Sequence, residues 1–173
     1  MKNKIAVLFG PVGGSTEKIA KLIAEKIGSD KCDIVPVKDA DEKLVSEYKN
    51  IIIGGSTIGT HNWSIPNSSN DWDEFLPKFR AINFEGKNCA IFGLGDHLGY
   101  PNSFVDSMRI IYDILKDNKA TIHGFCNTDD YEFNESQAIE DGKFVGLPID
   151  EDFEDELSSD RIDKWLKSFI DKM

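Results

Sequence analysis

Cysteine is scarce in this sequence, with three residues among 173. Cys32, Cys89 and Cys126 are odd in number, show no CxxC spacing and lie in or beside apolar runs. A disulfide framework would need paired cysteines, so we expect small reduced core residues instead. Histidine is equally rare, and the three residues lie in separate segments without the spacing of metal ligands, so no metal site is expected.

Long apolar runs and an excess of basic residues are also missing. The first apolar stretch is too short for a signal peptide or a membrane span, which predicts a cytoplasmic protein. Lys and Arg total 20 against 31 Asp and Glu, giving a net charge of -11. Such a surface repels nucleic acid and anionic membranes and suits a partner with a basic docking face, although it also serves solubility alone.

What the sequence does contain is a regular alternation of two patterns. Its length and its 40% hydrophobic content predict a single domain spanning residues 1–173. Short, nearly continuous apolar runs suit parallel strands buried on both faces. These runs are residues 5–9, 51–53, 90–92 and 122–125, and residues 32–37 form a weaker strand near an edge, because Pro36 cannot donate to a ladder.

Segments with helical spacing lie between the strands, at residues 16–27, 70–79, 103–115 and 160–170. This order predicts an α/β fold: a doubly wound parallel sheet of about five strands with helices on both faces. Residues 127–141 break the rhythm, between apolar runs at residues 122–125 and 144–149. We interpret these two runs as halves of one last strand, interrupted by an insertion.

In such sheets ligands bind beyond the carboxyl ends of the strands, so the loops after residues 9, 53 and 92 matter most. The first loop, GPVGGST, can turn backbone amides around an anion at a helix N-terminus, although glycine-rich turns often exist only to make the turn. It lacks the GK[ST] of a triphosphate loop and the GxGxxG of a dinucleotide site. The other two loops, at residues 54–63 and 92–104, offer apolar, aromatic and backbone groups for a planar heteroaromatic ring, or for ordinary loop packing.

Three stretches carry a specific family resemblance. The run FGLGDHLGYPNSFVDSM resembles the flavodoxin loop that edges the isoalloxazine of FMN, and NDWDEFLP resembles the start of that family's third helix. The stretch from residue 129 to residue 166 resembles the insertion of long-chain flavodoxins and its return. The match covers nearly the whole chain in order.

The resemblance implies a flavodoxin-like fold, non-covalently bound FMN, and one-electron transfer between redox proteins by a monomeric carrier that is not an enzyme. The first loop would hold the FMN phosphate, Tyr100 would stack on the outer face of the flavin, and Ile58 would lie along the inner face beside Thr57 and Gly59. The implied cofactor-binding residues are Gly10, Pro11, Val12, Gly13, Gly14, Ser15, Thr16, Ser56, Thr57, Ile58, Gly59, Gly93, Leu94, Gly95, Asp96, Tyr100 and Ser103, with no catalytic and no metal-binding residues.

Three positions depart from the family pattern. Flavodoxins usually carry Ser or Thr where this chain has Pro11 and Gly13, and Pro11 also lacks an amide hydrogen. An aliphatic side chain, Ile58, stands where many long-chain members have a tryptophan on the inner face of the flavin. Trp63 is either a substitute for that tryptophan or a loop anchor. His61 and His97 lie where they can respond to pH near the ring.

Two other functions stay open at this point. A flavodoxin-like NAD(P)H-dependent FMN or quinone reductase uses the same fold, but no nicotinamide site is recognisable. A degenerate module that binds FMN weakly is motivated by Pro11 and Gly13. A phosphoacceptor regulator is excluded, because its clustered acids are replaced by GPVGG and GGST.

Overall fold

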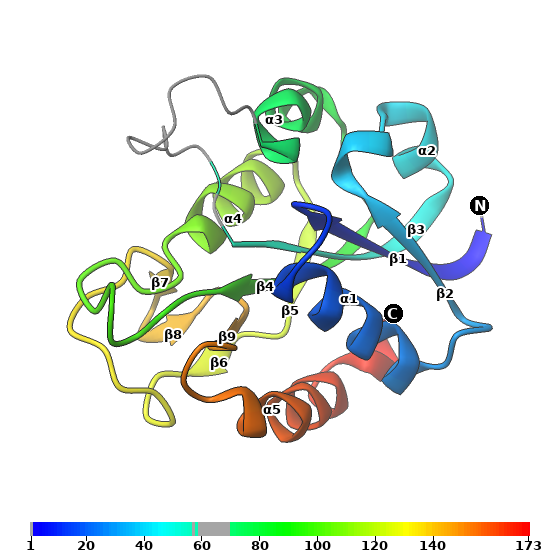
Figure 1. Cartoon of the computed structure of the whole chain (residues 1–173). Coiled ribbons are helices and arrows are strands. Elements are labelled where there is room, and N and C mark those ends of the chain that lie inside the picture. The colour runs from blue at the N-terminus through cyan, green and yellow to red at the C-terminus, as the bar shows by residue number, and fades with distance from the viewer. Residues whose placement is uncertain (1, 57, 59–69) are drawn as a thin grey trace.

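A parallel sheet with helices on both faces forms the frame of the chain in the computed structural model (Figure 1), which describes residues 2–56, 58 and 70–173. In spatial order the strands are β2 (Cys32–Pro36), β1 (Lys2–Gly10), β3 (Tyr48–Gly55) and β4 (Asn88–Leu94), followed by β5 (Thr121–His123) and β9 (Leu147–Ile149), which both pair with β4. The predicted fold class is confirmed. The strand that ends at Pro36 does lie at the edge of the sheet.

The fifth position of the sheet is shared by two short strands. β5 pairs with the first half of β4, from Asn88 to Ala90, and β9 pairs with the second half, from Phe92 to Leu94. The prediction of one interrupted last strand is therefore confirmed. Its second half is shorter than predicted, because Phe144 belongs to a separate small sheet and only Leu147–Ile149 joins β4.

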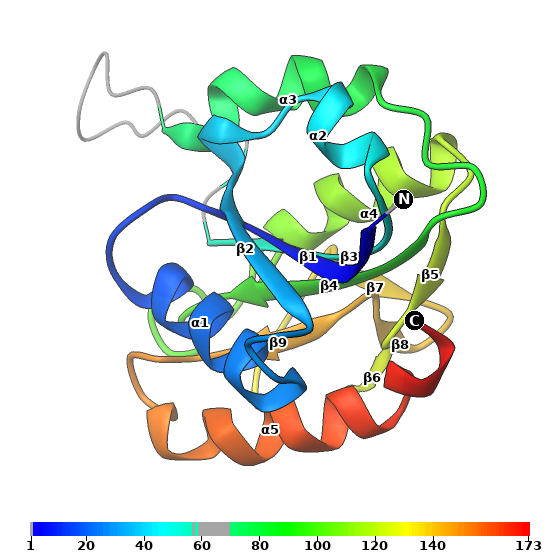
Figure 2. The same ribbon diagram turned by 90° about the vertical axis from the view of Figure 1, so that its right-hand side faces the viewer.

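Helices cover the two faces of the sheet in separate groups. Figure 2 shows α1 (Ser15–Ile27) and α5 (Asp155–Lys167) on one face, with α2 (Glu42–Ser46), α3 (Asp71–Ala81) and α4 (Ser107–Asp117) on the other. Short 3-10 turns, η1 (Val37–Asp39) and η2 (Ile170–Lys172), follow β2 and α5. The longer helices bury an apolar stripe, as in α1, where Ile19, Ala20, Ile23 and Ala24 are buried.

Two helix starts differ from the predicted ones. α4 begins at Ser107 instead of Ser103, because the backbone before it bonds to the insertion: Phe104 N donates to Glu135 O at 3.3 Å. α5 begins at Asp155 instead of Asp160, and so incorporates part of the acidic run. Acidic side chains favour the first turn of a helix, where they face the positive end of its dipole.

The insertion folds into an antiparallel sheet of its own, made of β6 (Cys126–Asn127), β8 (Lys143–Phe144) and β7 (Ile139–Glu140). Its aromatic rings pack on Phe104: the ring centroid of Phe133 lies 5.9 Å away and that of Phe144 lies 6.1 Å away. The sequence did not predict these strands. Cys32 and Cys89 are buried and Cys126 is half-buried, and all three are free, as expected of reduced core residues.

Candidate functional site

The carboxyl ends of the central strands meet at one edge of the sheet. Gly10 is paired with Gly55, Gly55 with Gly93, and Gly93 with Pro148. Glycine is needed in this row because neighbouring side chains leave no room for a larger residue. A Cβ on Gly55 would lie 2.5 Å from the indole nitrogen of Trp72. These strands therefore end side by side at the edge where a doubly wound sheet is predicted to bind a ligand.

The loop at residues 10–16 presents backbone amides to anions. Val12 N donates to a carboxylate oxygen of Asp71 at 2.8 Å, and Gly13 N donates to a carboxylate oxygen of Glu17 at 2.8 Å. Gly13 and Gly14 have φ values of 81° and 99°, a region that favours glycine, and a Cβ on either would meet nothing within 4 Å. The two carboxylates stand where an anionic ligand group would accept the same hydrogens, so the loop fits a phosphate monoester.

Cations lie close to this loop on the first helix. Lys21 Nζ is 2.6 Å from Glu17, and Lys18 Nζ is 2.5 Å from Glu151. The hydrogen bond from Lys21, followed by that from the Gly13 amide, holds the pKa of Glu17 below its usual range. Glu17 is thus a carboxylate at neutral pH and competes with any other anion for the Gly13 amide.

The first turn of α3 supports the loop at residues 10–16 through hydrogen bonds. Asn70 caps the helix in a capping box with Asp73, which places Asp71 and Trp72 in its first turn. The buried Trp72 indole donates to Gly10 O at 3.1 Å, while Asp71 accepts from Val12 N. The family resemblance predicted that this NDWD run begins a helix, but it assigned the run no role at the loop of residues 10–16.

The loop after β4 is organised by Asp96, whose carboxylate accepts hydrogen bonds from Leu98 N at 3.0 Å and Gly99 N at 2.6 Å. Tyr100 N donates to Asp96 O at 3.0 Å, and the Tyr100 side chain is 68% exposed at the end of this turn. An exposed ring on a fixed turn can stack on a planar ligand. The insertion holds the far side, where Asn134 N and Glu135 N both donate to Pro101 O.

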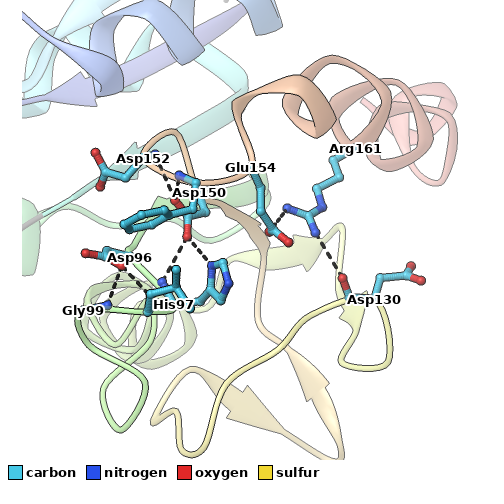
Figure 3. Close-up of polar contacts among 10 residues, drawn as sticks. Asp96, His97, Gly99, Asp130, Asp150, Asp152, Glu154 and Arg161 are labelled. Atoms are coloured by element: carbon cyan, nitrogen blue, oxygen red, sulfur yellow. Dashed lines mark hydrogen bonds and ion pairs between the residues drawn. The ribbon is translucent and has the colours of Figure 1, made fainter.

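A polar cluster links this loop to the turn between β9 and α5 (Figure 3). His97 Nδ1 lies 2.5 Å from Asp150 Oδ2, and the buried Asp150 also accepts from His97 N at 3.0 Å. Glu154 adds a carboxylate near both residues and pairs with Arg161 at 2.6 Å. Sequence spacing could not find this cluster, because His97 and Asp150 are 53 positions apart.

The ligand atoms of His97, Asp150 and Glu154 lie within 4.8 Å of one another, close enough to consider a metal ion. Tetrahedral zinc ligands, with bonds of about 2.0–2.1 Å, lie about 3.3 Å apart. The 2.5 Å between His97 Nδ1 and Asp150 Oδ2 is much shorter, and Arg161 already neutralises Glu154. The cluster has the geometry of a hydrogen-bonded network, not of a coordination shell.

The implied cofactor residues are placed as follows. Those of the first loop, with Gly93, Leu94, Gly95, Asp96, Tyr100 and Ser103, lie at or just beyond the carboxyl edge of the sheet, and Ser56 follows β3 there. Ile58 is buried in the core cluster that includes Trp72. Thr57 and Gly59, like His61 and Trp63, lie outside the described residues. His123 lies away from this edge, with its Nε2 3.2 Å from Asn88 at the start of β4.

Comparisons of this chain with family models, curated sequences and solved structures all find flavodoxins. The family model described as Flavodoxin matches residues 7–165. A flavodoxin of Buchnera aphidicola is 40% identical over 96% of this chain and 95% of its own length, and flavodoxin 1 of Escherichia coli is 35% identical over 96% and 93%. The crystal structure of Fusobacterium nucleatum flavodoxin bound to flavin mononucleotide superimposes with a TM-score of 0.86 at 27% identity, covering 98% of each chain. Within the described part of the chain, no helix is long and apolar enough to cross a membrane.

Proposed function

Because the chain belongs to the flavodoxin family, we propose that it binds one FMN non-covalently at the carboxyl edge of the sheet and carries single electrons between redox proteins. The observation that supports this most directly is the loop at residues 10–16, whose amides at Val12 and Gly13 already donate to anions. When bound, FMN supplies the one-electron redox chemistry. The fold contributes binding, orientation and exclusion of water.

Each loop has a separate task in this proposal. Amides and hydroxyls of the first loop, including Ser15 and Thr16, hold the phosphate at the start of α1, where the helix dipole favours negative charge. Tyr100 stacks on the outer face of the ring. Backbone groups of Leu94, Gly95 and Asp96 meet its pyrimidine edge. The inner face falls to Thr57, Ile58 and Gly59, and the buried Ile58 side chain has to turn out of the core to reach the ring.

The exchange of electrons needs a partner that approaches this edge. The net charge of -11 favours partners with basic docking faces. Exposed apolar side chains at the same edge, Val12, Leu98 and Tyr100, offer contact area once a partner arrives. We also propose that the chain acts as one monomeric domain, and that it works in the cytoplasm, in keeping with its three free cysteines.

Titration of the flavin-free protein with FMN, riboflavin and FAD tests the binding proposal. FMN should bind one per chain and more tightly than riboflavin, because only FMN uses the phosphate loop. FAD should bind more weakly, because its second phosphate and adenosine extend from a pocket suited to a terminal monoester. Equal affinity for FAD, or no FMN binding at millimolar concentration, would contradict the proposal.

Turnover measurements separate a carrier from a reductase. The FMN-loaded protein should not oxidise NADH or NADPH with a quinone above the rate of free FMN. It should instead accept one electron on photoreduction and pass it to an added one-electron acceptor. Sustained NAD(P)H oxidation would favour the reductase alternative.

A further inference from the structure

His97 connects two loops that the chain separates widely. It follows Asp96 in the turn after β4, whereas Asp150 directly follows β9. These two strands are parallel neighbours, with Leu94 paired with Ile149, and Gly95 N donates to Ile149 O at 2.9 Å. The sheet therefore delivers the imidazole and the carboxylate to the same place (Figure 3).

Asp150 is built to receive a proton donor from this turn. One oxygen accepts from the amides of Asp152 and Phe153, each at 2.9 Å, and the other accepts from the amide and the imidazole of His97. Burial alone raises the pKa of Asp150, but the hydrogen bonds from His97, Phe153 and Asp152 outweigh it and leave this pKa below its usual range. A carboxylate can only accept, so His97 Nδ1 carries the hydrogen.

Charged groups surround the imidazole of His97. Asp150 and Glu154 face it from the turn between β9 and α5, and Asp96 precedes it in its own turn. Arg161 of α5 is engaged by Glu154 Oε2 at 2.6 Å and by Asp130 O at 3.1 Å. Phe153 closes one side of the ring, with its centroid 6.1 Å away.

We propose that His97 is a positioning residue that latches the loop after β4 (residues 95–104), assigned to the flavin, to the turn between β9 and α5 through Asp150, and that this latch strengthens FMN binding. The inference rests on the proposed function, because the residues that His97 anchors are those assigned to the flavin. The turn from Asp96 to Tyr100 is tied internally by Asp96, and His97 ties it to the rest of the fold.

Three variants test the side-chain hydrogen bond. His97→Asn retains a side-chain N–H near the position of Nδ1. His97→Ala removes this donor. His123→Asn is the matched control, because His123 lies on β5 and its imidazole is 3.2 Å from Asn88, at the opposite end of β4.

FMN dissociation constants should be measured for all four proteins at pH 8.5 and one salt concentration. His97→Ala should bind FMN about tenfold more weakly than the wild type. His97→Asn should match the wild type within about twofold, because it retains the donor, and His123→Asn should follow the wild type.

Hydrogen exchange in the flavin-free proteins gives a second readout. The amides of Leu98 and Gly99 should exchange faster in His97→Ala but not in His97→Asn at pH 8.5. Wild-type FMN binding and exchange in His97→Ala, or FMN binding by His97→Asn that is as weak as that of His97→Ala, would overturn the proposal. If no protein binds FMN, the proposed function fails, and the exchange rates alone decide whether the latch exists.

Discussion

At the residue scale, Gly13 and Glu17 decide which groups of the loop at residues 10–16 are left for the proposed phosphate site. With a φ of 81°, Gly13 adopts a conformation in which a threonine would be strained by about 1–3 kcal/mol. Its amide is instead the useful group, and Glu17 Oε2 accepts from it at 2.8 Å. A carboxylate of the chain thus occupies a donor that a phosphate needs, and Lys21, 2.6 Å from that carboxylate, balances its charge.

Replacing Glu17 with Gln should therefore tighten FMN binding. The change removes a negative charge beside the phosphate and releases Lys21, which should lower the dissociation constant about three- to tenfold at low salt. Fluorescence quenching titrations at two salt concentrations would measure it. Glu25→Gln, an equal charge change on an exposed site two turns along α1, is the control and should have little effect. Weaker binding in Glu17→Gln would mean that the carboxylate shapes the loop instead of competing with the ligand.

At the scale of elements, the site loops are held by parts of the chain that do not belong to them. The first turn of α3 supports the phosphate loop through Trp72 and Asp71. The insertion supports the flavin loop, where Ser136 Oγ donates to Phe104 O at 2.6 Å. Preorganised loops bind more tightly because less conformational entropy is lost on binding.

Trp72→Phe tests this support with most of the ring volume retained. The lost bond from the indole to Gly10 O should lower the free energy of unfolding by about 1 kcal/mol and weaken FMN binding a few-fold. Trp165→Phe loses a bond of the same kind, from its indole to Gly124 O at 2.8 Å, far from the phosphate loop. Urea unfolding should show similar losses for both, and only Trp72→Phe should change the FMN dissociation constant. Equal FMN affinities in the two variants would contradict a role of Trp72 in supporting the loop at residues 10–16.

For the whole molecule, the excess of acidic residues sets how stability depends on pH. Several carboxylates have a lowered pKa in the folded state, among them Asp33, held by hydrogen bonds first from Tyr48 and then from Lys4. A group of this kind adds stability above its unfolded pKa of about 3.9, and this contribution is lost as the pH falls through the folded value. Protonation of the other acids then leaves 20 Lys and Arg residues to repel one another.

The free energy of unfolding should therefore fall steeply below about pH 4. Asp33→Asn should lower stability at pH 7 by up to about 1 kcal/mol, because Asp33 is partly exposed, and should reduce the loss between pH 4 and pH 2.5. Asp30→Asn removes an equal charge from an exposed position and should leave the acid limb unchanged. Urea unfolding from pH 2.5 to 8 would measure all three proteins. An acid limb that is identical in wild type and Asp33→Asn would contradict this assignment.

The sequence by itself determined the alternation of strands and helices, since buried parallel strands need continuous apolar runs and helices need a stripe. It also determined the edge strand through Pro36, the interrupted last strand, and the order of the loops at the carboxyl edge. These features depend on neighbours along the chain. The local pattern predicted the ends of elements less well. α4 begins later than predicted, because the backbone before it bonds to the insertion.

Only the tertiary structure decided which distant groups meet. Trp72 lies 62 positions from Gly10 and His97 lies 53 positions from Asp150, so neither contact leaves a periodic signal in the sequence. The small sheet of the insertion is equally hidden, because its strands are two residues long and pair with one another, while Phe144 packs on Phe104. Spacing along one chain predicts local structure, whereas the pairing of β4 with β9 fixes the contacts of the latch.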